Sequence, residues 1–95
     1  MINPHRYILG AYMRELRLKR IGSQKDFARL MGVSASYICE VETKGAIPSR
    51  EFLKKAADFL NVPLGALLKK SQAQKFRLFK EKMVRRSELE KAETK

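Results

Sequence analysis

The chain has 95 residues, a length that suits one domain rather than two. Its 21 Lys and Arg side chains outnumber 10 Asp and Glu, giving a net charge of +11. This charge favours a polyanionic partner, nucleic acid before an acidic membrane surface. A single Cys and a single His exclude an internal disulfide and a zinc site, and we expect no cofactor. No apolar run approaches the ~20 residues that span a bilayer, and no signal-peptide core is present, so we expect a soluble intracellular protein without a membrane partner.

The first helix is predicted over about residues 5–20. Asn3 is a favourable N-cap, and Pro4 suits the first helical position. Leu9, Met13 and Leu16 then follow at helical spacing and predict a buried stripe.

Residues 23–42 read as two short helices joined by a tight turn. Ser23 and Ser34 can each cap a helix, because a serine oxygen accepts from backbone N–H groups in the first turn. Gly32 stands where the first apolar stripe ends, and glycine tolerates the left-handed conformation that terminates helices. Two helices around a short Gly-containing turn are the form of a helix-turn-helix, whose second helix enters the major groove of DNA.

A loop over residues 43–48 leads to a helix predicted over 50–60, with Ser49 as its cap and Asn61 as its terminator. A short fifth helix follows at about 64–69. Since the sequence has neither alternating apolar runs nor hairpin turns, the fold class is all-α.

From Lys69 onward the chain becomes dense in charge. We therefore divide it into a helix-turn-helix domain, 1–70, and a basic amphipathic C-terminal helix or tail, 71–95, capped by Ser71. The last ten residues are expected to fray. Apolar residues at i, i+3 and i+7 predict a buried face on the tail, packed either on the same chain or on a second subunit; they are Phe76, Phe79 and Met83.

Taken together, these motifs resemble the phage-repressor helix-turn-helix family, of Cro/C1 or Xre type, over about residues 7–68. The resemblance implies a five-helix repressor-like DNA-binding domain, here with an additional C-terminal helix. It also implies an ion pair between Arg17 and Glu42. The residues that carry it are Leu16-Arg17, Ser23-Gln24, Phe27-Ala28, Gly32-Val33-Ser34, Ile38, Val41-Glu42, Pro48-Ser49, Leu53, Ala57, Leu60, Val62 and Leu67.

Candidate DNA contacts follow, most of them implied by the same resemblance. Residues expected to face bases are Gln24, Ser34, Ala35, Ser36, Tyr37 and Glu40. Residues expected to contact phosphates are Arg17, Ser23, Lys25, Thr43, Lys44, Ser49 and Arg50. Simpler alternatives stand beside these roles: Ser23 and Ser34 cap helices, Arg17 is structural, Tyr37 belongs to the core, and Cys39 is a bystander.

The predicted second helix of the motif carries no Arg or Lys to read guanine. We therefore expect specificity to be shared with Gln24, Lys44, the N-terminal residues His5 and Arg6, or the shape of the DNA.

The sequence thus predicts a sequence-specific regulator of double-stranded DNA, most simply a repressor. It would bind a palindromic operator as a homodimer joined through the fifth helix and the C-terminal helix. A bacterial or phage-encoded protein, cytoplasmic and associated with the nucleoid, fits this function. The alternative is an antitoxin-type or protein-interaction module whose C-terminal helix binds a partner protein. An enzyme is not expected, because no nucleophile has a base beside it and no phosphate-binding loop is present.

Overall fold

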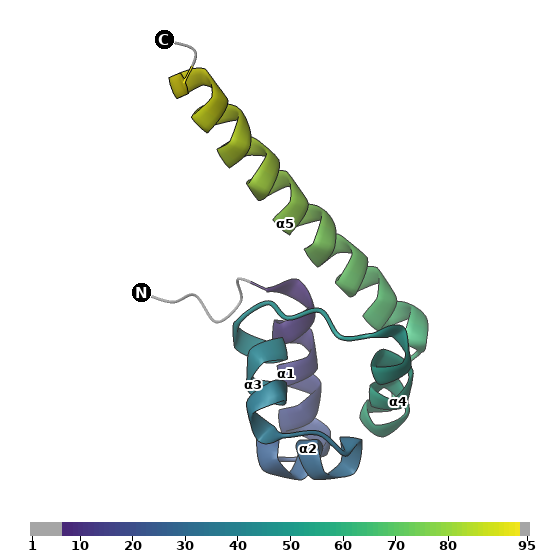
Figure 1. Ribbon diagram of the computed structural model, residues 1–95. Helices are drawn as coiled ribbons and strands as arrows, with labels where there is room; N and C mark the ends of the chain where they lie inside the picture. Colours follow the sequence, from purple (N-terminus) through teal and green to yellow (C-terminus); the bar gives the residue numbers. More distant parts are fainter. Residues whose placement is uncertain (1–6, 94–95) are drawn as a thin grey trace.

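The structure, a computed structural model, describes residues 7–93, with the side chains of residues 7–83. Within these residues the chain forms five helices: α1 (Ile8–Arg20), α2 (Gln24–Met31), α3 (Ala35–Thr43), α4 (Arg50–Leu60) and α5 (Leu64–Glu93). As Figure 1 shows, α1 to α4 pack together, and α5 starts beside α4 and extends well beyond the other helices. The predicted all-α class is confirmed, and no strand occurs within residues 7–93.

The core lies where α1, α2, α3 and α4 meet the first turns of α5. The predicted stripe of α1 is buried, with Leu9, Met13 and Leu16 all facing inward. Phe27 from α2 lies at the centre, fully buried, and Leu67 closes the core from α5. The remaining core side chains are Ala28, Met31, Ile38, Val41, Leu53, Ala56, Ala57 and Leu60.

Three serines begin three helices, as the sequence predicts. The Oγ atoms of Ser23, Ser34 and Ser49 accept backbone N–H bonds at 3.1, 3.1 and 3.2 Å from the residues three positions on. The predicted terminators Gly32 and Asn61 have φ of 69° and 56°, in the left-handed region. Local sequence therefore specifies both ends of α2 and α4 and the start of α3.

The start of α1 differs from the prediction. The helix begins at Ile8 rather than at residue 5, and Tyr7 before it has extended backbone, with φ −106° and ψ 111°. The predicted cap, Asn3 with Pro4, lies outside the described residues.

The separation of a fifth helix from a C-terminal helix is wrong, because α5 is one helix of 30 residues. No glycine or proline stands at the junction near Lys69 to interrupt it. Ser71, the expected cap, is instead buried inside the helix.

The face of α5 that packs on the domain is also not the predicted one. Leu67, Ser71 and Gln74 are buried at spacings of four and three residues. Phe76, Phe79 and Met83 lie on the other side and are 62%, 60% and 52% exposed. The alternative in which this stripe packs on its own chain is therefore wrong, whereas packing on a second subunit stays a prediction.

Candidate nucleic-acid interface

The second helix of the motif, α3, separates an inward face from an outward one. Ile38, Val41 and Glu42 are buried against the rest of the domain. Ser36 and Glu40, one turn apart, are exposed on the other side. The outward face of α3 therefore carries short polar groups and one carboxylate, and no cation.

A ring contact sets the first turn of α3 beside the first turn of α4. The rings of Tyr37 and Phe52 meet edge to face, with centroids 5.4 Å apart and planes at 85°. Tyr37 is half-buried and packs against the core, which supports the core alternative for its ring. Ser49 and Arg50, which precede Phe52 at the start of α4, are both exposed.

A buried ion pair joins α1 to α3. Arg17 Nε donates to Glu42 Oε2 at 2.8 Å, and Arg17 Nη2 donates to Glu42 Oε1 at 3.0 Å. Arg17 Nη1 donates to the carbonyl oxygen of Gly22, in the turn before α2. The two side chains are 6% and 1% exposed, so the pair is shielded from solvent. This is the structural pair that the family resemblance implies, and the phosphate contact also expected of Arg17 is not compatible with a guanidinium held inside the domain.

Gln24 extends this network to α2. Its Nε2 donates to Glu42 Oε1 at 3.3 Å, so one carboxylate is bonded from both α1 and α2. Gln24 is half-buried at the first position of α2, immediately after the cap Ser23. Its side chain braces α3, and the part that remains exposed leaves a base or phosphate contact as a prediction.

The loop after α3 is held by backbone bonds and close packing. The N–H groups of Lys44 and Ala46 both donate to the carbonyl oxygen of Glu40, at 2.9 and 3.3 Å. Gly45 has φ of 77°, and a Cβ atom there would lie 2.5 Å from the ring of Tyr7. Only glycine fits both the backbone conformation and this approach, so the loop between exposed Lys44 and α4 has a defined path.

The hydroxyl of Thr43 is already engaged. It donates to the carbonyl oxygen of Cys39, one turn back along α3, at 2.7 Å. The Cys39 sulfur lies 3.6 Å from the same hydroxyl oxygen. Thr43 can therefore accept a hydrogen bond from a ligand, but it can donate to a phosphate only by giving up this bond.

The structure distributes the predicted contact residues in three groups. Arg17 is buried, as is its partner Glu42. Gln24, Ala35 and Tyr37 are half-buried. Those that are exposed are Ser23, Lys25, Ser34, Ser36, Glu40, Thr43, Lys44, Ser49 and Arg50.

Sequence reasoning missed Gln74. It lies in the charged part of α5 yet is 2% exposed. Its Oε1 accepts from the N–H of Leu9 at 2.9 Å, and its Nε2 donates to the carbonyl oxygen of Gly45 at 3.2 Å. The available signal was the continuation of the spacing of Leu67 and Ser71, which passes through position 74.

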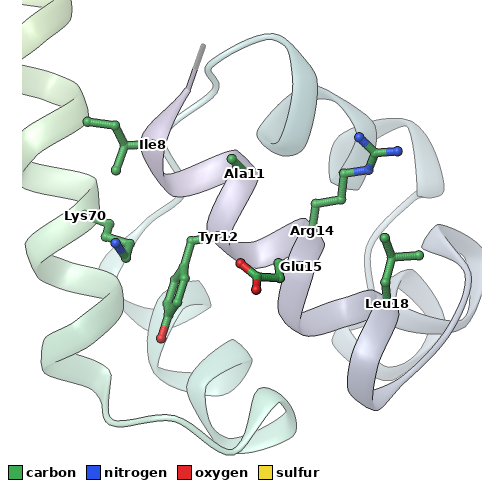
Figure 2. Close-up of a pocket in the computed structure, with 7 residues that line it drawn as sticks. All are labelled: Ile8, Ala11, Tyr12, Arg14, Glu15, Leu18 and Lys70. Carbon is green, nitrogen blue, oxygen red and sulfur yellow. The ribbon is translucent and has the colours of Figure 1, made fainter. Parts of the chain in front are cut away.

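A shallow groove of about 420 Å³ lies along the outer face of α1. Figure 2 shows Tyr12 between α1 and α5, with Lys70 nearby; the Lys70 ammonium is 4.7 Å from the centre of the Tyr12 ring. Glu15 is the only carboxylate that lines it; the others are Ile8, Ala11, Arg14 and Leu18. Its lining contains none of the predicted DNA contacts.

Among the side chains that the structure describes, no three of His, Cys, Asp or Glu gather as a metal site would require. Helices α1 to α5, as far as they are described, include no apolar segment of the length needed to span a bilayer.

These features define a helix-turn-helix domain: two short helices joined by a turn with a capping serine, an exposed second helix, and the buried pair of Arg17 and Glu42 behind that helix. The profile of the family described as Helix-turn-helix matches residues 13–67. The chain belongs to this family, of Cro/C1 or Xre type, and the match confirms the resemblance. The family consists of DNA-binding regulatory domains rather than of enzymes. The chain is also 34% identical over 55 residues to the uncharacterized HTH-type transcriptional regulator YazB of Bacillus subtilis (strain 168), a match that covers 58% of this chain and 80% of YazB.

Proposed function

We propose that the protein is a sequence-specific transcription regulator that binds double-stranded DNA as a dimer and represses by covering a promoter. The observation that carries this proposal is the exposed outward face of α3, whose first turn contacts the first turn of α4 through the rings of Tyr37 and Phe52. In a helix-turn-helix, an exposed second helix of this kind enters the major groove.

Contacts with phosphates would supply the affinity. Lys25, Lys44 and Arg50 are exposed cations near the ends of α2, α3 and α4. Cations that neutralise phosphates release counterions, so their contribution falls as salt rises. Contacts with bases would come from Ser36, Ala35 and Glu40, a weak set that fits a role for DNA shape and for two half-sites read together.

Dimerisation would use the exposed stripe of α5. Phe76, Phe79 and Met83 present three large apolar side chains on the side away from the domain's own core. A row of this kind on a long helix is typical of a helix–helix interface. A second copy of the chain is the proposed occupant, because a two-fold pair of domains doubles the few base contacts that one α3 can make.

A second function deserves a test because of the same stripe. In an antitoxin-type or interaction module, α5 would bind another protein instead of its own copy. Lys75, Arg77, Lys80 and Lys82 surround the stripe and would favour an acidic partner.

Titration of the protein onto its own upstream DNA and onto random DNA, at two salt concentrations, tests the proposal. A specific regulator should prefer its own site by ~10³-fold or more. That preference should persist at the higher salt, because the charge contribution is common to both DNAs. Equal binding to both DNAs would overturn sequence-specific regulation and leave the interaction module as the better explanation.

A further inference from the structure

Gln74 joins three separate parts of the fold through one side chain. From α5 it reaches the first turn of α1 at Leu9 and the loop between α3 and α4 at Gly45. These partners lie 65 and 29 residues away in the chain. The amide uses both of its ends, since the oxygen accepts and the nitrogen donates.

The two backbone groups that Gln74 bonds lie outside the regular hydrogen bonding of the helices. The Leu9 N–H belongs to the first turn of α1, where backbone donors have no partner within the helix. The Gly45 carbonyl lies in a loop whose path is already restricted by the positive φ of Gly45 and the ring of Tyr7. The Gln74 amide therefore completes the attachment of this loop to α1 and α5.

The loop that Gln74 holds is bounded by candidate phosphate contacts. Lys44 precedes Gly45 directly, and Ser49 with Arg50 begins α4 at the other end. We propose that Gln74 is a positioning residue for DNA binding: by fixing the loop at Gly45, α5 sets where Lys44 and Arg50 meet the phosphates. This inference rests on the proposed DNA-binding function and adds a role for α5 within it.

Gln74→Glu separates the two bonds. The carboxylate can still accept from the Leu9 N–H, but it has no donor for the Gly45 carbonyl oxygen and repels it. Gln72→Glu is the matched control, because it makes the same charge change two residues away at an exposed position of α5.

We expect Gln74→Glu to bind the upstream DNA about tenfold more weakly than Gln72→Glu, a loss typical of one buried hydrogen bond left unmade. We also expect the slope of log Kd against log salt to become shallower by about one, as for the loss of one phosphate contact. A residue that only stabilised the fold would not change this slope, provided that the protein is folded at the assay temperature.

A double-mutant cycle locates the effect. If Gln74 acts through the loop, Lys44→Ala should weaken binding less in the Gln74→Glu background than in the parent chain. Ser36→Ala, on the outward face of α3, should weaken binding equally in both backgrounds. Additive behaviour of Gln74→Glu with Lys44→Ala would overturn the proposal.

Gln74→Met, uncharged and of similar length, provides a second variant if the buried carboxylate unfolds the protein. It should show the same shallower salt slope. Loss of the helical circular dichroism signal in both variants, or an unchanged slope in either folded one, would make Gln74 purely structural. Slopes measured on random DNA report phosphate contacts even if the parent chain shows no preference for its own site, so failure of specific regulation and failure of this inference are distinguishable.

Discussion

Gly10 of α1 lies so close to the backbone of Glu42 in α3 that a Cβ atom at position 10 would be 2.6 Å from the Glu42 carbonyl oxygen. The carbonyl oxygen of Val41 would be equally crowded, at 2.5 Å. Since backbone atoms cannot move aside as a flexible side chain does, this contact sets the separation of the two helices. The same residue, Glu42, receives the bonds of Arg17 and Gln24, so the position of α3 depends on packing and charge at one point.

Gly10→Ala should therefore destabilise the fold. We expect a loss of about 2 kcal/mol or more in the free energy of unfolding, as for overpacked cores, measured by urea denaturation. Gly65→Ala is the control: a Cβ atom there meets nothing within 4 Å, and alanine favours helix. That variant should be unchanged or stabilised by up to ~1 kcal/mol. Equal stability of the two variants would show that α1 and α3 can separate freely.

Removal of the buried guanidinium of Arg17 should lower the stability of the fold more than removal of the exposed ammonium of Lys19. Arg17→Met leaves Glu42 buried without its ionic partner, which typically costs about 3–5 kcal/mol. Lys19→Met, on the same helix, breaks only the ion pair with Glu15, whose side chains are 67% and 61% exposed. Such a pair contributes ~1 kcal/mol or less. Thermal unfolding of the two variants side by side measures the difference, and a similar melting temperature for both would contradict a structural role for Arg17.

Two serines of the same helix region should separate stability from recognition. Ser34 Oγ accepts from the Tyr37 N–H, so Ser34→Ala should lower stability by about 1 kcal/mol through loss of the cap. Ser36 is exposed on the outward face, and Ser36→Ala should change stability by less than ~0.5 kcal/mol.

For binding to the specific DNA site, Ser36→Ala should have the larger effect of the two substitutions. The Ser36→Ala variant should bind this site about three- to tenfold more weakly, because it loses one hydrogen bond to a base edge, and it should bind random DNA as the parent chain does. Fluorescence anisotropy with the two DNAs measures this. If Ser36→Ala leaves specific binding unchanged, recognition comes from the flanking loop or from DNA shape.

Phe76→Gln combined with Phe79→Gln should abolish the proposed dimer while the fold remains intact, because both rings are exposed in the single chain. Sedimentation velocity measures the outcome. Leu18→Gln is the control, since it removes an equally exposed apolar side chain, 58% exposed, from α1 rather than from the stripe. Truncation after Lys70 is a poorer test, because it also removes the buried side chains of Ser71 and Gln74.

The outcome of this comparison decides between the two proposed occupants. A parent chain that is dimeric, with a monomeric double variant, supports self-association through the stripe. A parent chain that is monomeric at assay concentrations contradicts it and favours a partner protein.

Much of the domain was predictable because its signals are local. The caps Ser23, Ser34 and Ser49 and the terminators Gly32 and Asn61 act through their own backbone within a few residues. The pair of Arg17 and Glu42 was predictable only from the family resemblance, since 25 residues separate the two positions.

The faces of α5 show where the sequence misleads. Apolar spacing favours burial of Phe76 and Phe79, yet the domain buries Ser71 and Gln74. Polarity alone could not identify this face, because burial of Gln74 depends on hydrogen-bond partners from α1 and the loop, distant in the chain. The charge change at Lys69 likewise marks where α5 becomes more exposed rather than where a helix ends.

The length of α5 has a geometric consequence for the DNA site. A helix rises 1.5 Å per residue, so the 19 residues from Lys75 to Glu93 extend about 28 Å beyond the attachment at Gln74. If the α5 helices of two copies pair, the position along α5 at which they meet sets the separation of the two α3 helices. The operator would then be selected by the spacing of its half-sites as much as by their bases, and a change of a few base pairs between half-sites would be as damaging as the loss of a base contact.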